Sequence, residues 1–185
     1  MKEQLAYASL LLSLAANIPY IYQTIKGKVK PERISWLIWT VLGATYYLSA
    51  LFEGGATFFT FGELIGPGLI LLVSIKFGVG GKSKFDKLSL LVASIALGLL
   101  FALDGVIVSL LLALLIDAIA GILTLRKLLV DPASEPRLAW FIGGVAASTL
   151  ALFSLQNYSP ETVLFPAYVL VFSTLIVFKA NPSKK

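Results

Sequence analysis

The stretch NIPYIYQTIKGKVKPERISW, Asn17 to Trp36, decides the fold, because a second stretch repeats its plan. It contains the end of one apolar segment, a short basic loop and the start of the next apolar segment. The stretch DAIAGILTLRKLLVDPASEPRLAW, Asp117 to Trp140, has the same three parts with a longer loop. Internal similarity of this kind is the mark of a repeated structural unit.

The composition indicates a membrane protein. Hydrophobic residues make up 58% of the 185 residues, charged residues 14%, and the mean hydropathy is +0.89. Soluble domains have about 45–50% apolar and about 25% charged residues. A very apolar soluble helical protein is the alternative, but the apolar segments are close to the about 20 residues that cross a bilayer.

Seven apolar segments can be drawn between loops that contain Gly, Pro or charged residues. They cover residues 4–25, 34–52, 56–77, 86–103, 105–128, 137–156 and 160–179. We therefore predict an all-α membrane protein with seven transmembrane helices.

The basic residues predict the orientation of these helices. Fourteen of the fifteen lysines and arginines fall in alternate loops or in the C-terminal tail, and only Lys2 falls on the other side. The positive-inside rule then places the N-terminus outside and the C-terminus in the cytoplasm, in a plasma (inner) membrane. Because topology accounts for the positive charge, nucleic acid is not expected as a partner.

The repeat can be followed helix by helix. The first segment aligns with the fifth at an offset of 100, the second with the sixth at 104, and the third with the seventh at 99. The matched positions are polar or small residues, Trp or Pro, and include the following pairs: Ser9 and Ser109, Asn17 and Asp117, Thr24 and Thr124, Trp36 and Trp140, Pro67 and Pro166. The prediction is two parallel three-helix repeats, 1–78 and 105–185 with a basic tail, joined by a connector helix in 79–104.

A family resemblance follows from these residues. The segment PYIYQTIKGK, Pro19 to Lys28, resembles the motif of the SWEET and PQ-loop transporter superfamily, with Tyr20 in the place of the motif's Gln. In the second copy, Ile119 and Ala120 stand in place of both motif residues. The resemblance implies the same 3+1+3 plan and transport of a small solute such as a sugar, an amino acid or a vitamin precursor.

Glu63 is the first candidate binding residue. It lies inside the third segment, where a carboxylate costs about 2.5–3.5 kcal/mol at the bilayer centre unless it faces a cavity. Pro67 removes the amide that would bond to the carbonyl of residue 63, so a carboxylate and a free carbonyl share one level. The alternative is a Glu63 at the outer mouth of the helix, in contact with headgroups.

Asp117 and Asn17 are the second candidate site. They are equivalent positions of the repeat, and we expect them to face each other as an acid and an amide across a central cavity. The alternative is a fixed hydrogen bond that holds helices together.

The remaining candidates are aromatic residues, a threonine and prolines. Trp39 and Tyr46 would form an aromatic wall of the cavity, although tryptophans near helix ends also anchor proteins at the membrane interface. Thr162 is the repeat equivalent of Glu63 and would line the cavity. The hinge candidates, each a kink or a static bend, are Pro19, Pro67 and Pro166.

The sequence shows no nucleophile–base pair, metal-ligand cluster or phosphate loop, so neither an enzyme, a metal nor a cofactor is expected. It contains no His and no Cys. We predict a transporter that moves a small polar solute by alternating access. The alternative is a non-transporting receptor or scaffold of the same fold. The expected partners are the solute and membrane lipid, with a homo-oligomer left open.

Overall fold

The computed structural model describes residues 1–53 and 57–181, without the side chains of 49–53, 57–60 and 161. This part of the chain is all-helical, with seven helices and no strand. The prediction of seven helices is therefore confirmed. The end of the predicted basic tail, residues 182–185, lies outside the described part.

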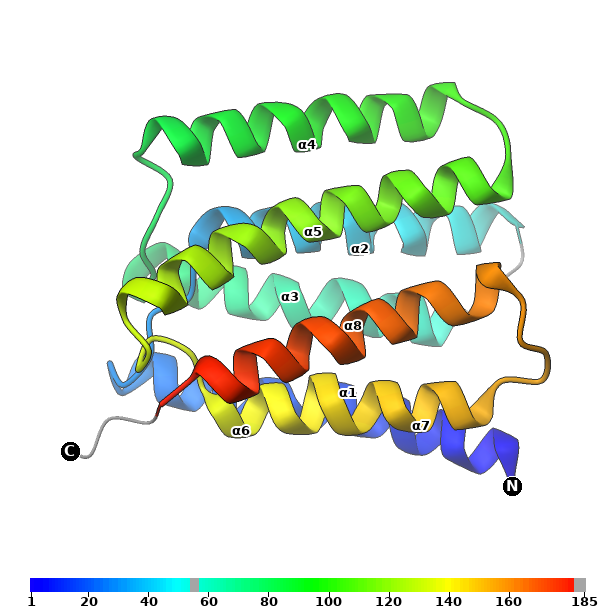
Figure 1. The fold of residues 1–185 in the computed structure, drawn as a ribbon, viewed down its shortest axis with the longest axis horizontal. Helices are drawn as coiled ribbons and strands as arrows, with labels where there is room; N and C mark the ends of the chain where they lie inside the picture. Colours follow the sequence, from blue (N-terminus) through cyan, green and yellow to red (C-terminus); the bar gives the residue numbers. More distant parts are fainter. Residues whose placement is uncertain (54–56, 182–185) are drawn as a thin grey trace. The chain divides into compact units, whose positions relative to one another are not determined.

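The helices agree with the predicted segments to within a few residues (Figure 1). The sixth segment is one rod made of three labelled parts, since a π-helical stretch, η1, interrupts the α-helix. In chain order the elements are α1 Lys2–Ile25, α2 Arg33–Glu53, α3 Thr57–Phe77, α4 Lys84–Ala102, α5 Val106–Val130, α6 Arg137–Trp140, η1 Phe141–Ala146, α7 Ala147–Ser154 and α8 Pro160–Lys179.

Within the described part of the chain, five helical rods are long and apolar enough to cross a membrane. They are Lys2–Ile25, Lys84–Ala102, Val106–Val130, Arg137–Ser154 and Thr162–Lys179. This count is consistent with a multi-pass membrane protein.

Local hydrogen bonds explain where two helices begin. Ser83 caps α4: its hydroxyl accepts from the amide of Asp86 at 3.0 Å, and Asp86 accepts from the amide of Ser83 at 3.0 Å. This reciprocal pair starts α4 two residues before the predicted segment, because capping does not depend on apolar periodicity. Ser159 and Pro160 start α8 as predicted, with Pro at a first-turn position.

The chain forms two compact units, which we describe separately. Unit 1 contains Met1–Val29 and Leu128–Lys185, and therefore α1, the rod from α6 to α7, and α8. Within it, the rod packs between the other two helices. The hydroxyl of Ser9 in α1 donates to the carbonyl of Ala147 at 2.8 Å, and Gly144 lies against Ser173 of α8.

Unit 2 contains Lys30–Lys127, and therefore α2, α3, α4 and almost all of α5. Its apolar core includes Ile38 and Leu42 of α2, two alanines of α4, and Ile116 of α5. The small side chains of α4, Ala93 and Ala96, allow its backbone to approach the neighbouring helices closely.

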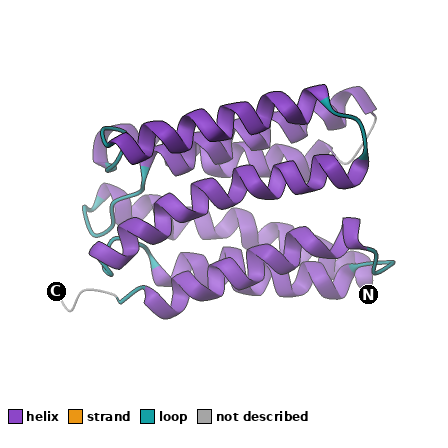
Figure 2. Cartoon of the chain, turned by 45° about the horizontal axis from the view of Figure 1, so that its top comes forward, coloured by secondary structure: helices purple, strands orange, loops and turns teal. Residues whose placement is uncertain are grey.

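The compact units divide the chain differently from the predicted sequence repeats. The boundaries fall at Val29/Lys30 and Lys127/Leu128, not near residues 78 and 104. Each unit combines helices from both predicted repeats: α1 lies with the sixth and seventh rods, whereas α5 lies with α2 and α3. Figure 2 shows the short loops that join the helices. The 3+1+3 repeat stays a prediction.

Candidate functional site

Three predicted site residues come together inside unit 2, each from a different helix. Tyr46 of α2 is close enough to interact electrostatically with both Glu63 of α3 and Asp117 of α5. The two carboxyl groups also interact with each other. Asp117 is 9% exposed, and the other two side chains are half-buried. We call these three residues the acidic cluster.

The acidic cluster lies in apolar surroundings. Tyr46 and Trp39 both pack against the core that contains Ile38, Leu42 and Ile116. The ring of Trp39 meets that of Trp36 edge to face, with centroids 4.9 Å apart. Two carboxyl groups in such surroundings are costly as bare charges unless a proton, a cation or hydrogen-bond donors compensate them.

The carbonyl that Pro67 leaves without an amide partner has a neighbour in α2. A Cβ atom built on Gly43 would lie 2.3 Å from the carbonyl oxygen of Glu63 and 2.8 Å from its carbon. Glycine at position 43 therefore lets α2 approach the backbone of α3 at the level of the acidic cluster. The sequence predicted that this carbonyl and the Glu63 carboxylate lie at one level and form a polar site. In the structure, Gly43 of α2 lies close to the carbonyl.

Asn17 and Asp117 belong to different units, so their predicted pairing stays a prediction. Asn17 is half-buried in α1, and its amide donates to the carbonyls of Ser13 at 3.1 Å and Leu14 at 3.2 Å. These hydrogen bonds satisfy the amide within its own helix.

Thr162 has a local role that the sequence reasoning did not anticipate. Its hydroxyl oxygen accepts from the amide of Ser159 at 3.1 Å and lies 3.0 Å from the carbonyl oxygens of Asn157 and Ser159. Thr162 thus completes the cap of α8. Whether it also lines a solute cavity stays a prediction.

The three hinge candidates lie inside helices that continue past them. Pro19 is within α1, Pro67 within α3 and Pro166 within α8. An unexpected backbone feature occurs elsewhere, in η1, the π-helical stretch with Gly143 and Gly144. Stretches of π-helix inside α-helices are often found at functional sites.

The sequence reasoning missed two buried glutamates. Glu32 lies just before α2 in unit 2 and is 3% exposed, while Glu135 lies just before α6 in unit 1 and is 2% exposed. Both stand within two residues of an arginine that starts an apolar segment, in both copies of the opening stretch. That shared position was the available signal.

In unit 2, Glu32 caps the start of α2. Its Oε2 accepts from the amide of Ser35 at 2.6 Å, and the Ser35 hydroxyl lies 3.0 Å from the same oxygen. That hydroxyl also lies 2.7 Å from the carbonyl oxygen of Ala120, and it accepts from Thr124 of α5 at 2.9 Å. The cap thereby ties α2 to α5.

The other carboxylate oxygen of Glu32, Oε1, is buried and has no hydrogen-bond partner among the described residues. It lies where a Cβ atom of Gly80 would be, and Gly80 has a φ of +87°, a backbone conformation that favours glycine. Burial raises the pKa of Glu32, and the negative charge of Asp86 raises it further. The two hydrogen bonds from Ser35 and the positive charge of Lys127 oppose this increase.

In unit 1, Glu135 joins α1 to the start of α6. The hydroxyl of Tyr20 donates to its Oε2 at 2.7 Å, and the indole N–H of Trp140 donates to the same oxygen at 2.7 Å. Tyr20 is thus a structural hydrogen-bond donor. Trp140 also packs edge to face on Phe172, with ring centroids 5.7 Å apart.

No group of three or more His, Cys, Asp or Glu side chains that could hold a metal ion occurs among the described residues. The candidate site is the acidic cluster, and Trp39 packs on the same apolar core as Tyr46. Comparison of the chain with family models, curated proteins and solved structures finds no match.

Proposed function

We propose that the protein is a membrane transporter that moves a small polar solute by alternating access. The observation that carries the proposal is the acidic cluster, since carboxyl groups are retained inside apolar helices mainly where they serve a solute, ion or proton path. Two carboxyl groups and a phenol favour a solute that offers hydroxyl or amino donors, of the sugar, amino-acid or vitamin-precursor classes.

The sequence alignment supports the repeat on which this proposal depends, and each compact unit combines helices of both predicted repeats. By the sequence alignment, α1 corresponds to α5, α2 to the rod from α6 to α7, and α3 to α8. Each unit therefore holds one helix of each type, and unit 2 has α4 in addition. The SWEET and PQ-loop transporters that the sequence resembles are built from two consecutive three-helix repeats joined by a connector helix, with the N-terminus outside and the C-terminus in the cytoplasm.

Counterflow in proteoliposomes tests the proposal. The purified protein is reconstituted into proteoliposomes that are loaded with one solute from a panel of sugars, amino acids and vitamins. The exchange of external labelled solute is then measured. Glu63→Gln and Asp117→Asn are each expected to reduce exchange at least tenfold. Glu3→Gln is the matched control, because it removes an exposed carboxylate of α1.

Two results would contradict the proposal. One is exchange that both substitutions leave at the wild-type rate. The other is a solute that raises the unfolding temperature, and so binds the folded protein, yet is never exchanged; that result would favour the receptor alternative.

A further inference from the structure

A group of basic side chains lies where α4 begins and α5 ends, within unit 2. Its members are exposed, and we call them the α4 basic patch: Lys82, Lys84, Lys87 and Arg126. The nearby acid is Asp86, whose Oδ2 accepts from the amides of Gly81, Lys82 and Ser83 at 2.8–3.1 Å. Its Oδ1 is 3.8 Å from Arg126. The patch therefore has four positive charges and one nearby carboxylate, which is already bound to backbone amides.

Two other basic side chains of unit 2, Arg33 and Lys127, bind backbone carbonyls of the same unit. Arg33 donates to the carbonyls of Ser74 at 2.9 Å and Gly80 at 3.3 Å, and Lys127 donates to the carbonyl of Lys30. By contrast, the ammonium groups of Lys82, Lys84 and Lys87 make no hydrogen bond or ion pair with any described residue. They remain available to a partner outside the fold.

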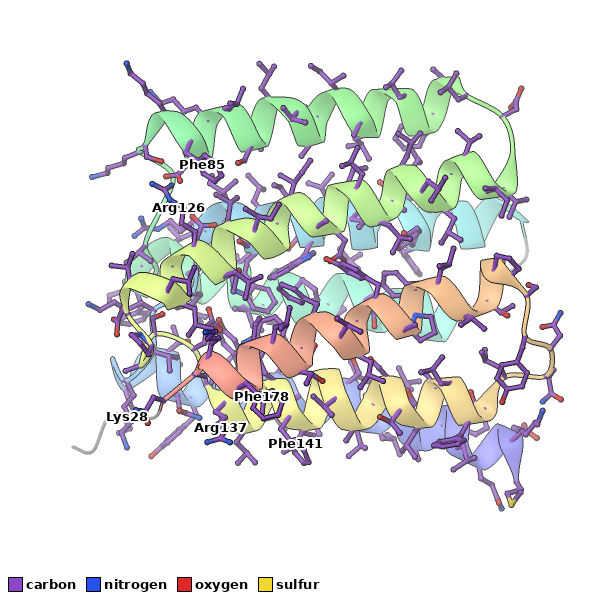
Figure 3. The ribbon with its side chains drawn as sticks, viewed as in Figure 1. Lys28, Phe85, Arg126, Arg137, Phe141 and Phe178 are labelled. Atoms are coloured by element: carbon purple, nitrogen blue, oxygen red, sulfur yellow. The ribbon has the colours of Figure 1, made fainter. Side chains whose placement is uncertain are left out.

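The patch has an apolar side as well. The guanidinium of Arg126 lies over the ring of Phe85, 4.7 Å from its centroid, and Figure 3 shows the two side chains facing each other. Phe85 is 39% exposed and Leu88, on the next turn, is 57% exposed. At the end of a membrane-spanning helix, such side chains suit the glycerol and acyl region, and the basic groups suit the phosphate level.

The side chains of Ser83 and Asp86 already bind four backbone amides at the start of α4, those of Gly81, Lys82, Ser83 and Asp86. The basic side chains are therefore the main groups available to an anion at this position. An ammonium or guanidinium group binds phosphate by charge and hydrogen bonding, and basic side chains beside a bilayer attract anionic lipids by about 1 kcal/mol each.

We propose that the α4 basic patch is a binding site for the headgroup of an anionic phospholipid. Lys84, Lys87 and Arg126 contact the headgroup phosphate, Lys82 adds positive charge, and Phe85 and Leu88 contact the upper acyl chains. The site needs α4 and α5 to lie in a membrane, but it does not depend on transport.

Lipid retention tests this site. The full chain is placed in phosphatidylcholine nanodiscs containing some phosphatidylglycerol, and native mass spectrometry measures the phosphatidylglycerol that stays bound. Lys84→Gln with Lys87→Gln is expected to weaken retention about 30-fold, which corresponds to about 2 kcal/mol for two charges. Phe85→Ala, which leaves the charge unchanged, is expected to weaken it severalfold.

The matched control is Lys26→Gln with Lys28→Gln, two exposed lysines of unit 1. A loss of threefold or less in this control supports a defined site. Equal losses in the two double variants would overturn the proposal, because retention would then follow total charge alone.

A second arm separates lipid from free phosphate. Inorganic phosphate added to pure phosphatidylcholine nanodiscs is expected to leave the unfolding temperature unchanged. Nanodiscs that include phosphatidylglycerol are expected to raise it. An equal increase with inorganic phosphate would contradict a lipid site. All variants should keep the wild-type unfolding temperature in pure phosphatidylcholine, since the substituted side chains are exposed.

Discussion

Units 1 and 2 differ in where they place their buried polar groups. In unit 1 the buried glutamate, Glu135, accepts from two side chains, and the interior rod contains the π-helical stretch η1. In unit 2 the buried glutamate leaves one oxygen without a partner among the described residues, α2 is a regular α-helix, and Tyr46, Glu63 and Asp117 form the acidic cluster. Unit 1 therefore joins its helices through a satisfied polar network, whereas unit 2 retains polar groups that its own side chains do not fully satisfy.

The largest expected effect comes from breaking the close helix contact in unit 2. Gly43→Ala would place a methyl group 2.3 Å from the backbone oxygen of Glu63, and a backbone cannot yield as a side chain can. Overpacking of this kind costs about 3 kcal/mol. Thermal or denaturant unfolding in detergent measures the loss.

Gly98→Ala is the control for that substitution. A Cβ atom at position 98 of α4 would meet nothing within 4 Å, and alanine favours a helix over glycine by about 1 kcal/mol. We expect this variant to be as stable as the wild type or slightly more so. If Gly43→Ala behaves in the same way, α2 and α3 do not make this contact.

A second prediction concerns the polar network of unit 1. Tyr20→Phe removes one of the two side-chain donors to Oε2 of Glu135, and a hydrogen bond to a charged group contributes about 1.5–3 kcal/mol. We expect a loss of about 2 kcal/mol in the free energy of unfolding. Tyr22→Phe, at an exposed position of the same helix, should change it by less than about 0.5 kcal/mol.

Equal stability of the two tyrosine variants would show that the hydroxyl of Tyr20 contributes nothing to unit 1. The contrast between the units would then be weaker than the hydrogen bonds indicate.

The smallest effect is a pH dependence in unit 2. Burial raises the pKa of Glu32 in the folded protein above its unfolded value. The folded state therefore binds the proton more tightly, and this contribution to stability is complete below the unfolded pKa and is lost as the pH rises through the folded pKa. Glu32→Gln should remove this part of the pH dependence, as measured by unfolding temperature across a pH series.

Glu3→Gln serves as the control for Glu32→Gln, and its pH profile should stay parallel to that of the wild type because the Glu3 side chain is exposed. A Glu32→Gln profile that also stays parallel would mean that the Glu32 proton does not influence folding.

The helices were predictable because apolar length and loop chemistry determine them. Predicted segments 34–52 and 160–179 correspond to α2 Arg33–Glu53 and α8 Pro160–Lys179. The π-helical stretch in Phe141–Ala146 was not predictable, because the residues FIGGVA also suit an ordinary α-helix. The two kinds of helix differ in which backbone carbonyl accepts from each amide.

The candidate site could be predicted in part. Glu63 and Asp117 were found because carboxyl groups are costly inside apolar segments, and Tyr46 was chosen as part of an aromatic wall; the structure brings these three together. Their role in binding stays a prediction. Glu32 and Glu135 were missed because burial of a loop residue depends on tertiary packing, such as the approach of Gly80 to Glu32.

The discontinuity of unit 1 has a consequence for the order of synthesis. Unit 2 is one continuous stretch, Lys30–Lys127, whereas α1 packs with helices that begin at Arg137. A growing chain therefore completes α1 more than a hundred residues before its packing partners exist, and contacts between such distant segments form late. The Asn17 amide donates to carbonyls of its own helix. Its hydrogen bonds can therefore form before the packing partners of α1 have been synthesised.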